Sequence, residues 1–203
     1  MEDRSPRTTW IVAAGALFEL GLTAIAWGLG WLLGISPWAS LRPEPRAVVL
    51  GAAATLPMLA AFLPLAHSSW PPLRRIRRFF EEEIRPLLGR CTLAALILLG
   101  LAAGVGEETL FRGVLQAALT RWLGTWPALA LASLLFGLLH PITPAYLVLA
   151  ALLGAYLGAL WLASGNLLVP VVAHALYDIL ALVYLLRVLP PNGPPLGEGA
   201  APE

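Results

Sequence analysis

The sequence of 203 residues contains no lysine, a single cysteine and little charge of either sign. Charged residues make up 12% and hydrophobic residues 59% of the chain, whereas soluble domains carry about a quarter charged residues, so we exclude a soluble enzyme. Cys91 alone forms no intramolecular disulfide and no multi-cysteine zinc or iron–sulfur site. The net charge of +1 provides no basic field, so no nucleic-acid partner is expected.

What the chain has in place of charge is a series of long apolar runs. A membrane helix needs about 20 mostly apolar residues, and the first run is too long for the apolar part of a signal peptide. We predict an all-α, polytopic transmembrane bundle of about six membrane helices in one integral-membrane domain over residues 1–189. The expected spans are residues 10–35, 47–66, 91–119, 126–140, 143–163 and 167–189.

Three smaller features complete this picture. Pro57 and Pro64 are expected to kink the second span, because each removes a backbone donor. Glycines four residues apart, such as Gly100 and Gly104, predict close helix packing in lipid. Residues 190–203 are rich in proline and glycine and are predicted to be a disordered tail.

The only long polar connection, residues 67–90, mixes clustered arginines with aromatic and aliphatic side chains. This composition fits a helix in the headgroup region and equally a solvated cytoplasmic loop, and both interpretations stay open. Positively charged loops stay cytoplasmic, so the arginine distribution predicts that both termini are cytoplasmic. With six crossings, the inner arginines are Arg4, Arg7, Arg74, Arg75, Arg77, Arg78, Arg85, Arg90 and Arg187, and the outer ones are Arg42, Arg46 and Arg121.

Ionisable side chains inside apolar runs are expensive and mark function by default. The predicted spans contain Glu19, Glu107, Glu108, Arg112, His140, His174 and Asp178, with Arg187 near the last helix end. Glu19 either faces the bundle and contacts the site or reaches toward the membrane surface.

The third span carries two adjacent carboxylates, which cannot both stay ionised in hydrocarbon without compensation. Arg112 lies one helical turn after Glu108 and can pair with it, whereas Glu107 is rotated by about 100° and points elsewhere. We expect Glu108 and Arg112 to brace the helix and Glu107 to face a cavity as a proton acceptor. The alternative is a single ion-pair cluster that holds helices together.

Two of the three histidines lie within or at the end of apolar runs. His140 alone, before Pro141, is typical of a cap, and His174 with Asp178 one turn later is typical of a buried hydrogen-bonded pair. Together with Glu107, however, they supply the groups that activate water and stabilise an oxyanion. The same side chains (Glu107, His140, His174 and Asp178) are also candidate ligands of a divalent metal such as zinc, and their spacing does not decide between the two chemistries.

Three motifs in order resemble the CPBP family, the CAAX prenyl endopeptidases and their bacterial relatives in bacteriocin processing and self-immunity. The motifs are Glu107-Glu108-x-x-x-Arg112, Phe136-x-x-x-His140 and His174-x-x-x-Asp178, and the resemblance covers residues 91–189. It implies an intramembrane endopeptidase in a bacterial plasma membrane, described in the family both as metalloprotease and as metal-free glutamate protease. It implies that Glu107 is the general base and that His140 helps to hold or activate the water. It also implies that His174 and Asp178 polarise the scissile carbonyl and that Glu108 and Arg112 are structural support.

This chain departs from the family at Asp178, a position that is often asparagine. A deprotonated carboxylate donates no hydrogen bond, so Asp178 must be protonated, orient His174 or bind metal. The predicted substrate is a membrane-associated peptide or protein in the lipid bilayer. Two other functions stay open: a non-catalytic immunity or partner-binding protein, and an ion or proton carrier, although the chain shows no inverted repeat of the kind transporters carry.

Overall fold

A computed structural model describes residues 6–190, with side chains from Thr9 onward, and this range is helical without a strand. The prediction of an all-α fold is confirmed. Arg4, the side chain of Arg7 and nearly all of the predicted tail lie outside the described residues. The elements are α1 (Pro6–Leu33), α2 (Pro45–Ala66), α3 (Pro71–Phe79), η1 (Phe80–Ile84), α4 (Arg85–Leu88), α5 (Leu93–Leu110), η2 (Phe111–Gln116), α6 (Ala117–Leu123), α7 (Thr125–Leu138), α8 (Pro144–Ser164), α9 (Leu168–Val183) and η3 (Tyr184–Val188), where η denotes a π-helical segment.

Five of these helices are long and apolar enough to cross a membrane. They are α1, α2, the continuous helix α5–η2–α6, α8, and the continuous helix α9–η3. The predicted span over residues 126–140 corresponds to the shorter apolar helix α7, which has 14 residues. At 1.5 Å per residue it is about 21 Å long, against a hydrocarbon core of about 30 Å. The helix ends early because Pro141 follows three residues later, and the chain turns there with His140 N–H bonded to the carbonyl of Gly137.

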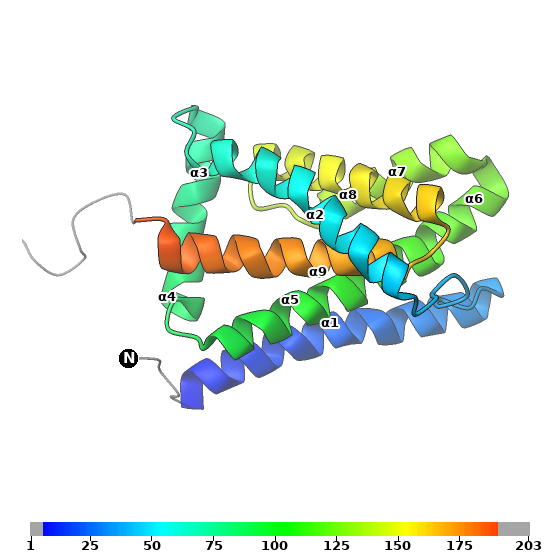
Figure 1. The fold of residues 1–203 in the computed structure, drawn as a ribbon, viewed down its shortest axis with the longest axis horizontal. Helices are drawn as coiled ribbons and strands as arrows, with labels where there is room; N and C mark the ends of the chain where they lie inside the picture. The colour runs from blue at the N-terminus through cyan, green and yellow to red at the C-terminus, as the bar shows by residue number, and fades with distance from the viewer. Residues whose placement is uncertain (1–5, 191–203) are drawn as a thin grey trace, which may run out of the picture.

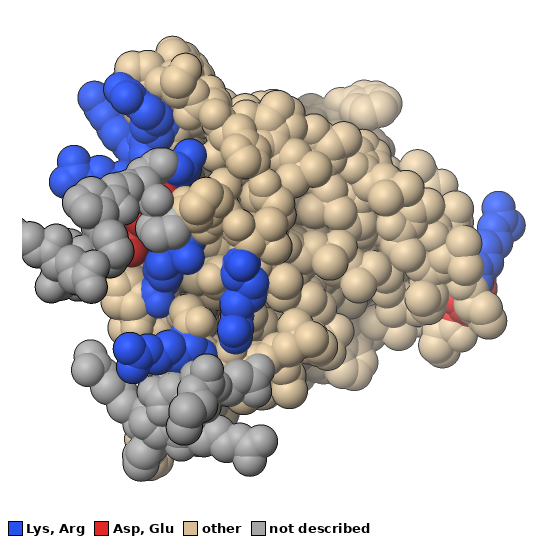
Figure 2. Space-filling model, turned by 60° about the vertical axis from the view of Figure 1, so that its left-hand side comes forward, with Lys and Arg blue, Asp and Glu red and all other residues tan. Residues whose placement is uncertain are grey.

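The helices run along the long axis of the molecule, with α9 between α5 and α2, and α1 beside α5 (Figure 1). Helix α7 packs against α8. Both ends of the described chain lie at one end of the bundle, and the α3–η1–α4 segment crosses that same end (Figure 1). The predicted polar connection is therefore helical over residues 71–88, and arginines gather at this end of the molecule (Figure 2). Pro57 and Pro64 both lie inside the uninterrupted helix α2.

Close packing between α5 and α9 depends on small residues. A Cβ atom added to Gly104 would lie 2.8 Å from the Cβ of Ala175, and one added to Gly100 would lie 2.5 Å from a side-chain carbon of Ile179. The close approach predicted from the glycine spacing is therefore present. It sets α9, which carries two of the predicted site residues, directly against α5, which carries two others.

Two of the arginines counted for topology connect the last helix to the basic end of the bundle. Arg85 donates from Nη2 to the carbonyls of Leu185 at 2.5 Å and Leu189 at 2.9 Å, and Arg187, within η3, donates to the carbonyl of Cys91 before α5. Carbonyls at a helix C-terminus lack intrahelical partners, so the contacts of Arg85 supply them. The basic end of the bundle thus holds the α3–η1–α4 segment and the start of α5 against η3.

Candidate active site

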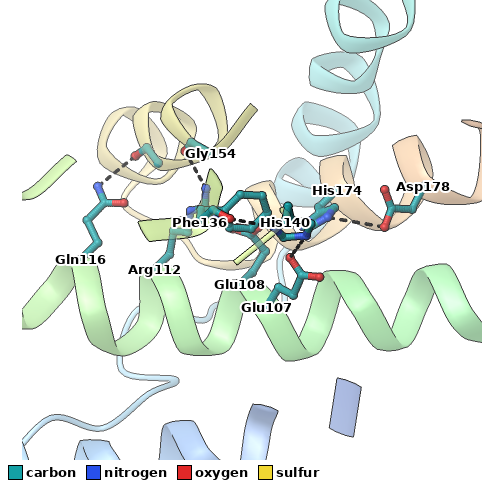
Figure 3. Close-up of polar contacts among 10 residues, drawn as sticks. Glu107, Glu108, Arg112, Gln116, Phe136, His140, Gly154, His174 and Asp178 are labelled. Atoms are coloured by element: carbon teal, nitrogen blue, oxygen red, sulfur yellow. Dashed lines mark hydrogen bonds and ion pairs between the residues drawn. The ribbon is translucent and has the colours of Figure 1, made fainter. Parts of the chain in front are cut away.

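Three helices bring the predicted site residues together near the middle of the bundle (Figure 3). Glu107 and Glu108 lie at the end of α5, His140 follows α7, and His174 and Asp178 lie one turn apart on α9. Residues that are up to 71 positions apart in the sequence therefore form one cluster, as the sequence predicted.

Glu108 and Arg112 lie in a sealed part of this cluster. Arg112 Nη1 donates to Oε1 of Glu108 at 2.8 Å, and Nη2 donates to the carbonyl of Gly154 at 2.6 Å. The Glu108 side chain is 0% exposed and the Arg112 side chain is 2% exposed. The predicted ion pair is present. Helix α8 supplies the second acceptor through the backbone of Gly154. One turn later, Gln116 Nε2 donates to the carbonyl of Gly158.

His174 joins the same carboxylate from another helix, a contact that the sequence did not predict. Its Nδ1 lies 2.8 Å from Oε1 of Glu108, and its Nε2 lies 3.5 Å from Oδ2 of Asp178. A carboxylate therefore faces each ring nitrogen of His174. The bond to Glu108 fixes the ring plane, and Asp178 lies on the side of the ring that faces the cavity described below.

Glu107 points away from this sealed part. Its Oε2 lies 3.8 Å from Nε2 of His140 and has no hydrogen-bond partner among the described residues, although the atom is buried. His140 Nδ1 lies 2.7 Å from the carbonyl of Phe136. Because a carbonyl only accepts, Nδ1 carries the proton, and in the neutral ring Nε2 faces Glu107 as an acceptor.

The aromatic ring of Phe136 borders both parts of the cluster. His140 stacks on it with ring centroids 4.6 Å apart, and the guanidinium carbon of Arg112 lies 5.0 Å from its centroid. His174 and Phe111 contact the ring edge-on. The ring therefore separates the sealed cation from the histidine that faces the cavity.

A cavity of about 480 Å³ adjoins the cluster. Glu107, His140, His174 and Asp178 all line it, and most of the remaining wall is apolar and comes from α2, α8 and α9. This volume is within the range of about 300–1,000 Å³ found for small-molecule sites, so there is room for water and a short peptide segment. The predicted convergence on one hollow space is present.

The candidate ligands do not form a metal-binding group in the part of the chain that the structure describes. No set of three or more histidine, cysteine and acidic side chains there is placed to hold a cation. Nδ1 of His174 lies against Glu108 and Nδ1 of His140 against the carbonyl of Phe136, so each histidine presents Nε2 to a carboxylate, that of Asp178 or Glu107. The sequence left ligation of a divalent metal by Glu107, His140, His174 and Asp178 open, and this arrangement does not support it.

Glu19 faces the bundle, which decides between the two orientations left open by the sequence. Its backbone carbonyl oxygen packs against Gly106, and its side-chain Oε2 is buried without a hydrogen-bond partner among the described residues. The sequence signal for Glu19 was its charge within an apolar run.

A comparison with protein families shows that residues 89–180 match the family described as Type II CAAX prenyl endopeptidase Rce1-like. This segment is Rce1-like. The resemblance predicted from the three motifs is confirmed, and the Rce1-like segment contains all six of their charged and histidine residues. Searches of curated proteins and of solved structures returned no match.

The five long apolar helices and the Rce1-like match together indicate an integral membrane protein with a segment similar to CAAX proteases. The match covers slightly less than half of the chain and begins after α4. Helices α1, α2 and α3 therefore lie outside the Rce1-like segment, although α2 and α3 line the same cavity.

Proposed function

We propose that the chain is an intramembrane endopeptidase that hydrolyses a peptide bond of a membrane-associated substrate with water activated by Glu107 and His140. The observation that carries this proposal is the proximity of Glu107 and His140, which both line the cavity and lie 3.8 Å apart between Oε2 and Nε2. A water molecule in the cavity can donate to the Glu107 carboxylate and to His140 Nε2 at ordinary hydrogen-bond distances. Its lone pairs then point away from both acceptors, toward a bound carbonyl carbon.

In the first step the water oxygen bonds to the scissile carbonyl carbon while one proton passes to Glu107. The carbonyl π electrons move to the oxygen, which becomes an oxyanion. Collapse of this tetrahedral intermediate breaks the C–N bond, and the proton held by Glu107 passes to the leaving amine. Glu107 is thus general base and then general acid, a role that contributes typically 10²–10⁴-fold in rate.

His174 and Asp178 are proposed to polarise the carbonyl oxygen. His174 Nε2 lies on the cavity side of the ring, so an N–H at this atom can donate to the developing oxyanion. Asp178 Oδ2, 3.5 Å away, stabilises positive charge on that ring and holds its orientation. Of the three roles that the sequence left to Asp178, this geometry favours orientation of His174.

Glu108 and Arg112 act as positioning residues in this proposal. Glu108 fixes His174 through Nδ1, and Arg112 neutralises Glu108 and ties it to α8 through the carbonyl of Gly154. A fixed imidazole needs no reorganisation when charge develops, which is the main benefit of a preorganised site.

We further propose that the protein lies in a bacterial plasma membrane with both termini cytoplasmic. The two described ends share one end of the bundle with the arginine-rich α3–η1–α4 segment (Figure 1), in agreement with the positive-inside rule. The apolar cavity walls on α2 and α8 suit a substrate segment that comes from the bilayer.

Comparative proteomics of membrane and secreted fractions from wild-type and Glu107→Gln cells tests the activity and finds the substrate. We expect at least one membrane-associated protein to accumulate uncleaved in the variant. A biological effect of the protein that survives Glu107→Gln, with no change in any cleavage product, would instead identify a non-catalytic partner-binding protein. Solute transport in sealed vesicles, lost in Glu107→Gln without proteolysis, would identify a carrier.

A further inference from the structure

A charged side chain outside the Rce1-like segment also lines the cavity. Arg77, on α3, is part of the cavity wall, and its side chain is 16% exposed. Arg78, the next residue, is 75% exposed and faces away. Both arginines pair with a glutamate four residues later, so the two pairs differ in location and not in type.

Arg77 lies at the α3 end of the cavity. It is next to Leu185, which lines the same cavity and also borders a smaller hollow with Arg77. Leu185 follows Asp178 by seven residues on the same continuous helix, which places it about 10 Å further along the axis. The cavity therefore has the hydrolytic cluster at one end, a guanidinium at the other and apolar walls between them.

The guanidinium is held by an internal carboxylate. Arg77 Nε donates to Oε1 of Glu81 at 3.1 Å, and the Glu81 side chain is 15% exposed. The planar fork of arginine suits a carboxylate bound through two nitrogens, which is a stronger arrangement than a single contact through Nε. Glu81, which lines the smaller hollow, thus contacts Arg77 through Nε, and a carboxylate from the cavity would compete with it for the guanidinium.

We propose that Arg77 binds a carboxylate of the peptide substrate, which displaces Glu81, and so helps to set substrate specificity. This inference rests on the proposed peptidase function, because it places the carboxylate in the cavity that holds Glu107 and His140. The carboxylate is either an acidic side chain or a free chain end, since the same guanidinium geometry suits both. A peptide is favoured over an anionic lipid because the cavity wall that contains Arg77 is continuous with the proposed hydrolytic groups.

The test is a binding measurement in the Glu107→Gln background, which separates binding from cleavage. The probes are dansyl-labelled pentapeptides of alanine and leucine in three forms: with a free C-terminal carboxylate, with a carboxamide end, and with a carboxamide end and one internal glutamate. Binding is measured in uncharged detergent and in nanodiscs that contain phosphatidylglycerol. The added variants are Arg77→Ala and Glu81→Gln, with Arg78→Ala and Glu82→Gln as matched controls from the exposed pair.

We expect at least one carboxylate peptide to bind more tightly than the neutral peptide. A hydrogen bond to a charged group contributes enough for Arg77→Ala to weaken its binding by about tenfold, to the level of the neutral peptide. Glu81→Gln removes the competing carboxylate and tightens the binding, whereas the two controls leave it unchanged. An ion pair that only stabilises α3 would shift binding in the same direction for Arg77→Ala and Glu81→Gln. The preferred carboxylate form identifies its source as the side chain or the chain end.

Three results would overturn the inference: equal binding or no binding of all three peptides, equal effects of Arg77→Ala and Arg78→Ala, or loss of the carboxylate preference in phosphatidylglycerol nanodiscs. The last result would identify a lipid headgroup as the occupant. Cleavage by the wild-type protein without any carboxylate preference would contradict only this inference. A carboxylate preference without cleavage of any substrate would contradict only the peptidase function.

Discussion

The sealed half of the site, formed by Glu108, Arg112 and Gln116, differs from its open half, formed by Glu107, His140 and Asp178. In the sealed half the side chains are buried, and Glu108 Oε1, Arg112 and Gln116 bind one another or backbone carbonyls of α8, although Glu108 Oε2 has no hydrogen-bond partner among the described residues. In the open half Glu107 keeps one buried oxygen without a hydrogen bond among the described residues, and His140 and Asp178 are partly exposed to the cavity.

Glu107 and Glu108 are adjacent in the chain and identical in chemistry, so the difference comes from helix geometry alone. Successive residues of a helix are rotated by about 100°, which turns Glu108 toward Arg112 and His174 and turns Glu107 toward His140. The comparison separates groups that maintain the structure from groups that are available to a substrate. The first two predictions below each change one half, the third changes the helix contact between them, and the fourth changes a residue outside both.

The largest expected effect is on activity in the open half. Glu107→Gln should lower the cleavage rate by about 10²–10⁴-fold, because the amide cannot accept the proton of the attacking water. Thermal unfolding in detergent should be unchanged, since the oxygen that is altered has no hydrogen bond among the described residues. Cleavage assays and unfolding curves of the same preparations measure both, with Glu82→Gln as the exposed control. Cleavage at the wild-type rate would contradict the assignment of Glu107.

In the sealed half, Arg112→Ala should lower the free energy of unfolding by about 3–5 kcal/mol. It removes the partner of a fully buried carboxylate and leaves the carbonyl of Gly154 without its donor. Unfolding by titration with a denaturing detergent measures the change. Arg78→Ala, which breaks an exposed pair of the same type, should have little effect. Equal effects of the two substitutions would show that burial of the Glu108 pair has no energetic consequence.

Gly104→Ala tests whether the helix contact that holds both halves together is close. Its added methyl group would lie 2.8 Å from the Cβ of Ala175, the residue after His174, so α9 must move. Such overpacking costs about 1–3 kcal/mol of stability, and we also expect slower cleavage. Gly21→Ala is the control, because a Cβ there has no neighbour within 4 Å. If unfolding and cleavage assays show no difference between the two variants, α5 and α9 can move apart to admit the methyl group without loss of stability or activity.

The smallest effect is expected outside both halves. Arg85→Ala removes donors from carbonyls at the end of η3 and should lower stability by about 1 kcal/mol. The cleavage rate should not change, since no hydrolytic residue contacts Arg85. Arg90→Ala, at an exposed position of the same segment, serves as the control in the unfolding measurement. A loss of activity that exceeds the loss of stability would place Arg85 in the site after all.

Contacts along one helix could be predicted from the sequence, and contacts between helices could not. The four-residue spacing gave both the Glu108–Arg112 ion pair and the His174–Asp178 contact, because residues one turn apart share a face. The contact of His174 with Glu108 spans 66 residues and depends on how α5 and α9 pack, which no local pattern encodes. The roles of Phe136 and Gly154 at the site were missed for the same reason.

The length of the span predicted over residues 126–140 was overestimated, because apolar composition continues where the helix does not. Residues 126–140 are apolar almost throughout, but Pro141 ends the helical hydrogen bonding early, and α7 packs against α8 as a shorter element. Glu19 was recognised as unusual from its charge, but its orientation followed only from the packing of α1 on α5.

The cavity draws its reactive side chains and its lining from different stretches of the chain. The reactive groups lie on α5, after α7 and on α9, whereas Pro57, Met58, Phe62, Leu73 and Arg77 come from helices that precede residue 89. Substitutions in that earlier stretch can therefore retune which peptides are accepted while the hydrolytic machinery keeps its geometry. An engineer seeking new selectivity would begin with α2 and α3 and leave the histidines alone.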